Sequence, residues 1–306
     1  MSSTTTPDTS ALRPMPAARG LSPTLRDLSA GARAWRLWGH LGWQDVRRRY
    51  RRSLIGPFWM TVTMATTTMG LGILFGVLLG NRLPTFLPYI GSGLIVWGFI
   101  GGCLLEGPES FTASDEMIKQ VPAPLTAFVL RTVWRQLITM GHNMIIYVIL
   151  VVAFFGDLHQ HNYTMNGQPC QPGGMVCQPG LGWSALLAIP GLLLLVATMT
   201  AAALALGIVA TRFRDIKQLI GSLVQLLFFV TPISWPLDSF IQRVGDKQWI
   251  LQLNPLFHFV QIVRQPLVGQ RVDWWSWVIA AGLTALTWLL ALVMMSRYRY
   301  RVSYWL

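Results

Sequence analysis

The chain has 306 residues, of which 53% are hydrophobic and only 12% are charged. This composition excludes an ordinary soluble domain and equally a disordered chain. The 24 basic residues outnumber the 12 acidic ones, which gives a net charge of +12, and most of them are arginines, which favour phosphates and anionic lipid headgroups as neighbours. The sequence therefore predicts an integral membrane protein in contact with membrane lipids.

The N-terminal part is predicted to hold a tail and an interface helix. Residues 1–30 are rich in Ser, Thr, Pro and Ala, so we expect a disordered tail, and we find no signal peptide in it. Residues 31–53 sort at helical spacing into an arginine-bearing side and a second side with Trp35, Trp38, Gly42 and Val46. Such an amphipathic helix lies in the plane of the lipid headgroups.

Five arginines crowd the end of this helix: Arg47, Arg48, Arg49, Arg51 and Arg52. A soluble nucleic-acid-binding protein would not follow such a cluster with 27 uncharged residues, so no nucleic acid partner is expected. Two interpretations remain open. The arginines could bind the phosphate of a lipid-linked substrate, or they could only anchor and orient the chain.

The rest of the chain, 54–306, is predicted to be an all-α transmembrane domain. Six uncharged runs of 20 or more residues are long enough to span a bilayer, and they lie within predicted spans at about 54–80, 83–105, 126–156, 181–211, 216–237 and 272–296. A further apolar stretch, 248–263, is shorter and carries Asn254 and Pro255 in its middle. It suits a pair of re-entrant external gate helices between spans five and six.

The distribution of Lys and Arg predicts that both termini are cytoplasmic. With that orientation, 19 of the 24 basic residues face the cytoplasm, as the positive-inside rule requires. They lie in 1–53, in 106–135, which includes Arg131 and Arg135, in 212–217 and in 297–306. The loop 157–180 contains no Lys or Arg and would lie outside, where Cys170 and Cys177 are expected to form a disulfide. Their spacing is too wide for the usual zinc motif, even with His159 and His161 nearby, so no metal site is expected.

The cytoplasmic loop between spans two and three is predicted to contain a short helix, Ser110 to Gln120, with Asp115 and Glu116 in an early turn. An isolated helix of that length is marginal unless it packs on something. It either docks a partner or belongs to an ordinary solvated loop. Aromatic residues near the end of span five leave a similar choice between a sugar-binding path and a membrane-interface belt.

Catalytic groups are missing from the predicted spans. The uncharged runs contain no Asp, Glu, Lys or Arg, so they offer no intramembrane acid–base pair. None of the three lysines has the Gly-Lys-Ser/Thr context of a phosphate-binding loop. We therefore expect no enzymatic activity and no cofactor in this chain, and a partner must supply the energy.

The stretch "GWQDVRRRYRRSLIGPFWMTV" resembles the entry to the first span of ABC-2 type permeases that export polysaccharides. The matching residues are Arg49, Tyr50, Arg51, Ser53, Gly56, Pro57 and Trp59. Three later stretches, "TPISWPLDSF", "LNPLFHFVQIVRQPLVGQ" and "RYRYRVSYWL", resemble that family's fifth-span exit, gate segment and basic C-terminus. The chain departs from the pattern at Val121-Pro122, where an aromatic residue is common before the proline.

The resemblance implies a non-enzymatic permease subunit in the cytoplasmic (inner) membrane. It would form a homodimer with two copies of a separate ABC subunit that binds and hydrolyses ATP, and it would move lipid-linked O-antigen, capsular polysaccharide or teichoic acid outward. The alternatives are an ABC-2 exporter of drugs or small lipids and, from another class, a membrane-embedded transferase acting on lipid-linked sugars.

Carried onto this chain, the resemblance assigns two groups of residues. The channel or gate would include Phe58, Trp59, Phe228, Phe229, Trp235, Asn254, Pro255 and Arg264. Contact with the ATPase subunit would involve Asp115, Glu116, Met117, Ile118, Lys119, Arg212, Arg214 and Lys217.

Overall fold

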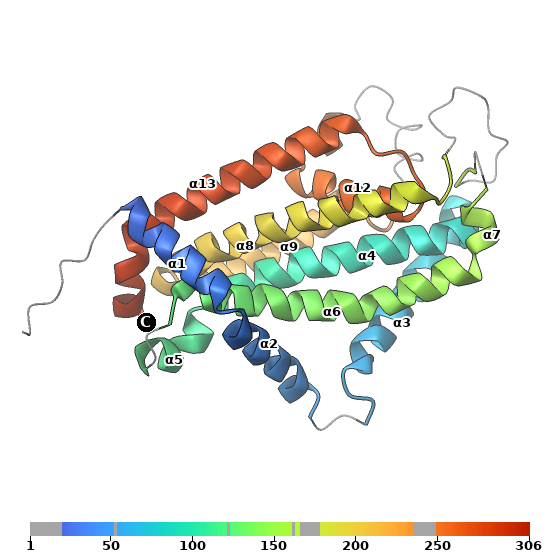
Figure 1. Ribbon diagram of the computed structural model, residues 1–306. Coiled ribbons are helices and arrows are strands. Elements are labelled where there is room, and N and C mark those ends of the chain that lie inside the picture. Colours follow the sequence, from blue (N-terminus) through green and yellow to red (C-terminus); the bar gives the residue numbers. More distant parts are fainter. Residues whose placement is uncertain (1–19, 52–53, 121–122, 161–162, 166–177, 236–248) are drawn as a thin grey trace, which may run out of the picture.

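The computed structural model describes residues 20–51, 54–120, 123–160, 163–165, 178–235 and 249–306. Within these ranges the chain folds into a bundle of helices (Figure 1). The described part contains no β-strand, only an isolated antiparallel bridge between Tyr163 and Gln178. The all-α prediction is therefore confirmed.

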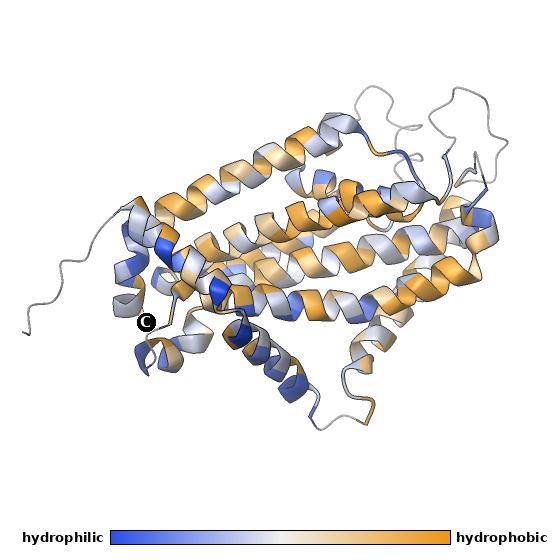
Figure 2. Cartoon of the chain, in the orientation of Figure 1, coloured by the Kyte–Doolittle hydropathy of each residue, from blue (hydrophilic) through white to orange (hydrophobic). Residues whose placement is uncertain are grey.

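Five helices are long and apolar enough to cross a membrane: α3 (Phe58–Leu79), α4 (Leu83–Glu106), α6 (Leu125–Ala153), α8 (Ala188–Arg212) and α13 (Trp274–Trp305). They lie along one another and are apolar over most of their length (Figure 2). Five of the six predicted spans fall on these helices.

The predicted fifth span corresponds to α9 (Ile216–Val230), which has 15 residues. At about 1.5 Å per residue, α9 is roughly 22 Å long and does not reach across about 30 Å of hydrocarbon by itself. The chain bends after α9 at Thr231, and residues 236 and 237 of that span lie outside the described ranges. The six-span count stays a prediction.

Helix α4 forms the centre of the bundle and is almost wholly buried. It packs against α3, α6, α8 and α9. Glycines permit the close approach of α3: a Cβ at Gly72 would lie 2.4 Å from Leu87, and one at Gly76 would lie 2.6 Å from Leu83. The surrounding helices expose leucines such as Leu74 and Leu289, as lipid-facing helices do.

The N-terminal region differs from the prediction. Residues 21–30 are helical and belong to α1 (Leu21–Arg33), so the predicted disordered tail is wrong there; residues 1–19 lie outside the described ranges. The single interface helix predicted over 31–53 is instead the end of α1 followed by α2 (Trp35–Arg49). The two helices meet at Ala34, where the Trp38 indole donates to the Gly31 carbonyl at 3.1 Å. Tertiary packing on α6 orders this polar stretch.

The loop after α4 forms three short turns instead of one helix. They are η2 (Gly107–Glu109), η3 (Thr112–Ser114) and α5 (Asp115–Gln120), so the predicted helix from Ser110 begins five residues late. The reason is packing: Phe111 is fully buried, and a Cβ at Gly207 of α8 would lie 3.0 Å from its ring. Close contact with α8 holds residues 107–114 in tight 3₁₀ turns.

At the other end of the bundle lie α7 (Phe155–Leu158), η4 (Trp183–Leu187), α11 (Trp249–Gln252) and α12 (Pro255–Leu267). Asn254 separates α11 from α12, as predicted, and its side chain accepts the Leu256 amide at 3.0 Å as an N-cap. The first half is only one turn, whereas α12 is almost entirely buried.

Helix α1 and the C-terminus lie at the same end of the bundle. In Figure 1 the C-terminus and α1 lie beside α5, while α7 is at the opposite end. Arg299 of α13 donates to the Pro23 carbonyl of α1 at 2.7 Å, which ties the first and last helices together. This arrangement is compatible with α1 and the C-terminus on one side of a membrane.

Candidate functional site

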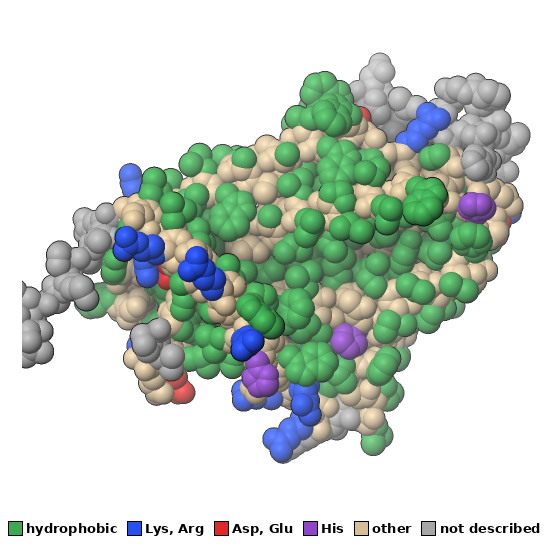
Figure 3. All heavy atoms as spheres, viewed as in Figure 1, with side chains coloured by type: hydrophobic (Ala, Val, Ile, Leu, Met, Phe, Trp, Pro, Cys, Tyr) green, Lys and Arg blue, Asp and Glu red, His purple; other side chains and the backbone are tan. Residues whose placement is uncertain are grey.

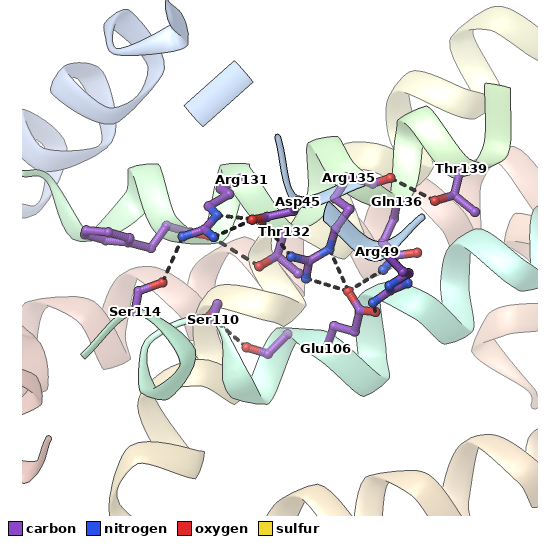
Figure 4. A network of polar contacts seen from close by, with 12 residues as sticks. Asp45, Arg49, Glu106, Ser110, Ser114, Arg131, Thr132, Arg135, Gln136 and Thr139 are labelled. Atoms are coloured by element: carbon purple, nitrogen blue, oxygen red, sulfur yellow. Dashed lines mark hydrogen bonds and ion pairs between the residues drawn. The ribbon is translucent and has the colours of Figure 1, made fainter. Parts of the chain in front are cut away.

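A network of charged side chains lies where α2, α4 and α6 meet (Figure 4). Asp45 of α2 accepts two hydrogen bonds from Arg131 of α6, from Nε and Nη2, each at 2.7 Å. Arg135, one turn further along α6, also donates to Asp45, at 2.9 Å. The side chains are 13–18% exposed. The two parallel, charge-assisted hydrogen bonds from Arg131 make this a strong, bidentate ion pair.

Glu106, the last residue of α4, continues the network. Its Oε2 accepts from Arg135 Nε at 3.0 Å and Nη2 at 2.5 Å, and from Gln136 at 2.6 Å. Its Oε1 accepts from Arg49 of α2 at 3.1 Å. One carboxylate therefore joins α2, α4 and α6.

The charges of the network keep its carboxylates ionised. Burial raises the pKa of Asp45, but the hydrogen bond and positive charge of Arg131, together with those of Arg135, outweigh burial and hold the pKa below its ordinary value. Arg131 also donates to the Ser114 hydroxyl at 3.4 Å. The network thus reaches from the arginine-bearing α2 to the turns that precede α5.

Outside this network, the buried carboxylate of Asp27 fastens α1 to the bundle. It accepts from the backbone amides of Leu125 and Thr126 at 3.2 and 3.1 Å and from the Thr126 hydroxyl at 2.6 Å. It therefore caps the N-terminus of α6 from another helix, where a negative charge is favourable. Arg299 of α13 pairs with the same carboxylate at 3.1 Å.

The structure brings the two predicted ATPase-contact segments together at this end. In α5, Asp115 pairs with Lys119 at 2.8 Å, Glu116 is exposed, and Met117 and Ile118 pack toward the core. Lys217 of the second segment forms an ion pair with Glu109 of η2. A cavity of about 380 Å³ between the segments is lined by Glu109, Asp115, Arg214 and Lys217, and also by the C-terminal Trp305 and Leu306.

Arg212, the last residue of α8, contacts aromatic rings. Its guanidinium lies 5.4 Å from the Phe213 ring centroid and 5.2 Å from that of Trp305, a cation–π arrangement. The end of α13 therefore belongs to the same surface as the two predicted ATPase-contact segments, although the sequence indicated only that it was basic.

The predicted gate residues Asn254 and Arg264 lie on one buried unit. Arg264 of α12 is fully buried; it donates to the Pro232 carbonyl at 2.7 Å and to the Gln261 amide oxygen at 3.1 Å, and it lies 4.0 Å over the Tyr89 ring. The Asn254 amide donates to the Thr231 hydroxyl at 2.7 Å. Pro255 is the first residue of α12. These contacts fasten α12 to α4 and to the bend after α9.

The predicted aromatic channel residues fall into separate places. Phe228 packs on Trp97 of α4, with ring centroids 5.8 Å apart, and Phe229 is largely exposed. The Trp235 carbonyl accepts from the Tyr89 hydroxyl. At the start of α3, Phe58 lies edge-on to His142 of α6, and Trp59 is half-exposed. A continuous aromatic path stays a prediction.

In the arginine cluster, Arg47, Arg48, Arg49 and Arg51 are exposed, while Arg52 lies outside the described residues. The predicted apolar side of the helix packs partly on protein: Gly42 and Val46 are buried, and Trp38 lies edge-on to Trp134 of α6 at 5.8 Å. Trp35 is exposed. The space-filling view shows basic side chains gathered at the end of the molecule that carries α1 and α2 (Figure 3).

The predicted disulfide between Cys170 and Cys177 falls outside the described residues, as does His161. His159 stacks on Phe155 and hydrogen-bonds the Leu181 carbonyl at 2.9 Å. Among the residues that the structure places, no group of three His, Cys, Asp or Glu side chains could hold a metal ion.

The sequence interpretation missed the charged network. It counted Arg131 and Arg135 as cytoplasmic loop charges, yet both lie on α6. The sequence did contain a signal for the network. Two arginines four residues apart share one helix face, and the uncharged run that follows them must bury its apolar face. Asp27 carried no such signal, because its partners lie about a hundred residues away.

The ABC-2 type transporter family matches residues 36–268, well over half of the chain. The chain belongs to this family. The match runs from α2 to the end of α12, so this ABC-2 transporter domain contains both the charged network and Arg264. Helices α1 and α13 lie outside the match.

Curated relatives of this ABC-2 transporter chain include two proteins named O-antigen export system permease protein RfbA. That of Myxococcus xanthus is 24% identical over 214 residues, which is 70% of this chain and 73% of the relative. One from Klebsiella pneumoniae is 21% identical over 217 residues, with the same shares. The curated relatives that this chain resembles are therefore named as transport subunits.

Proposed function

We propose that this chain is the permease subunit of an ATP-driven exporter that moves lipid-linked polysaccharide, an O-antigen or a capsular glycan, across the cytoplasmic membrane. The observation that carries the proposal is the family match over residues 36–268 together with relatives named as O-antigen export permeases over 70% of the chain. The chain itself is no enzyme, and it binds no cofactor.

In this proposal a separate ABC subunit binds and hydrolyses ATP, and two copies of it serve a homodimer of this chain. The surface at the cytoplasmic end supports that assignment. It combines Asp115 of α5 with Arg214 and Lys217 around one cavity, a polar, concave surface on which another subunit can dock. Both termini lie on the same side as this subunit, in the cytoplasm.

The substrate enters at α2. A lipid-linked glycan carries a phosphate or diphosphate at the depth of the headgroups, where the exposed Arg47, Arg48, Arg49 and Arg51 present guanidinium groups. Guanidinium binds phosphate oxygens in pairs. Trp35, exposed on the same helix, suits the boundary between headgroups and acyl chains. The buried α12 and its Arg264 contacts then form the outer gate.

The test of the proposal is deletion and complementation. A strain lacking this chain should accumulate lipid-linked glycan inside the cytoplasmic membrane and display none on its surface, and the wild-type chain should restore display. Normal surface glycan in the deletion strain would refute the polysaccharide assignment.

Variants separate the roles of the two surfaces. Replacing Asp115, Glu116 and Lys119 together should abolish display while the chain stays at normal membrane levels, because Glu116 and Lys119 are exposed and the ion pair of Asp115 with Lys119 lies within α5. Changing the five clustered arginines to lysine keeps the charge that orients the chain but removes the planar guanidinium, so display should fall. Arg271→Lys, on the exposed loop before α13, is the matched control and should display normally.

A further inference from the structure

Arg49 takes part in two features at once. It belongs to the exposed arginine cluster at the end of α2, and its guanidinium donates to Glu106 of the charged network. Arg131 and Arg135, in contrast, point into the network from α6 (Figure 4). Arg49 is therefore placed between the proposed phosphate-binding surface and the end of α4.

The network holds Arg49 far less tightly than the other two arginines. The Arg49 side chain is 54% exposed and contacts Glu106 Oε1 at 3.1 Å, whereas those of Arg131 and Arg135 are 16% and 18% exposed. Three donors from Arg135 and Gln136 hold the other oxygen of Glu106. If Arg49 leaves, Glu106 keeps these partners, so the exchange costs little.

Glu106 lies where a change can reach the ATPase-contact loop. It directly precedes η2, whose Glu109 pairs with Lys217. The charged network also reaches η3, because Arg131 donates to the Ser114 hydroxyl. When Arg49 releases Glu106, the electrostatic potential therefore changes at the residue directly before the segment that leads to α5.

We propose that Arg49 is a sensor of lipid phosphate: it exchanges Glu106 for the phosphate of a lipid bound at the arginine cluster, and the broken Arg49–Glu106 contact signals loading to residues 107–120. This inference rests on the proposed function. A phosphate offers guanidinium two oxygens in a fixed geometry, which a single exposed contact to Glu106 does not. The phosphate can come from the lipid-linked substrate or from an anionic phospholipid, and the experiment separates the two.

The test measures ATP hydrolysis by the complex of this chain with its ATP-binding subunit in phosphatidylcholine vesicles. Geranylgeranyl diphosphate or phosphatidylglycerol is added in separate arms. The wild-type complex should be stimulated several-fold. Stimulation by the diphosphate alone assigns the signal to a substrate-like lipid, and equal stimulation by phosphatidylglycerol assigns it to membrane phospholipid. A wild-type complex that responds to neither overturns the inference.

Arg49→Gln mimics the released state, because the neutral glutamine side chain cannot form the ion pair with Glu106. Its basal hydrolysis should rise to the stimulated wild-type rate and respond to neither lipid. A basal rate at or below the wild-type level contradicts the inference, whether or not stimulation persists. Arg49→Lys keeps the charge without the planar fork, and it should shift half-maximal stimulation to higher diphosphate concentration; an unshifted response also contradicts the inference.

Arg82→Gln is the matched control. Arg82 pairs with Asp157 at 3.3 Å, and the side chains are 49% and 29% exposed, close to the values for Arg49 and Glu106 but at the other end of the bundle. This variant should behave as wild type. A complex that hydrolyses no ATP under any condition, or normal glycan display without the chain, would instead contradict the proposed function.

Discussion

Buried charges are held differently at the two ends of this bundle. At the end that carries α1 and the C-terminus, carboxylates from α1, α2 and α4 neutralise arginines of α6 and α13. At the other end, a peptide carbonyl, an amide oxygen and a tyrosine ring hold Arg264. Ion pairs between separate helices can exchange partners, whereas an arginine fixed by backbone and ring is tied to one geometry. The ion pairs at the first end are therefore movable contacts, whereas Arg264 at the second end is a rigid anchor.

The largest effect is expected at the rigid anchor. Arg264→Lys removes the planar group that bonds Pro232 and Gln261 and stacks on Tyr89, and it leaves buried acceptors without donors. We expect a loss of about 3 kcal/mol, seen as a lower thermal unfolding midpoint of the purified chain in detergent. Arg271→Lys, on an exposed residue, is the control and should leave the midpoint unchanged. An unchanged midpoint for the Arg264 variant would show that the site is not an anchor.

An intermediate effect is expected at Asp27. Asp27→Ala removes the acceptor for two amides of α6 and the partner of Arg299. Loss of such a cap costs about 1–2 kcal/mol, and protease should cut within α1 sooner than in the wild type. Asp273→Ala removes the N-cap of α13, a 3.3 Å contact at an exposed position, and should lower the stability less than Asp27→Ala. Equal cleavage rates in wild type and Asp27→Ala would contradict the role of Asp27.

The smallest stability effect is expected at Asp45, because its surroundings are partly exposed and Glu106 still neutralises Arg135. Asp45→Asn should cost about 1 kcal/mol, yet it should reduce glycan export per molecule of chain while ATP hydrolysis by the complex continues. Asp157→Asn breaks the exposed pair with Arg82 and should change neither quantity. If export falls only in proportion to the amount of chain, the network supports folding alone.

The sequence predicted the features that depend on local pattern. Long uncharged runs located α3, α4, α6, α8 and α13, since hydrophobic length predicts a span, but α8 begins at Ala188 instead of 181 and α13 continues past 296 to Trp305. Asn254 and Pro255 marked the start of α12 because a proline with a preceding cap begins a helix. The family resemblance, carried by residues 43–59 and by the later gate stretch, agrees with the match over residues 36–268.

The features that depend on distant contacts were missed. Residues 21–30 look disordered by composition, and distant contacts order them, among them those of Asp27 with Thr126 and Arg299 and that of the Pro23 carbonyl with Arg299. Residues 110–114 have no helix-breaking residue, yet burial of Phe111 against α8 holds them in 3₁₀ turns. The site was half predicted: the cluster containing Arg49 was expected, but its contact with Glu106 joins residues 57 positions apart.

The most direct measurement of the central claim is glycan translocation in inverted membrane vesicles. Vesicles with this chain and its ATP-binding subunit should move radiolabelled lipid-linked glycan into their lumen, out of reach of an added glycosidase, when ATP is supplied. Vesicles with either subunit alone should leave the glycan accessible, because this chain has no phosphate-binding loop. ATP-independent protection, or protection by this chain alone, would contradict the account.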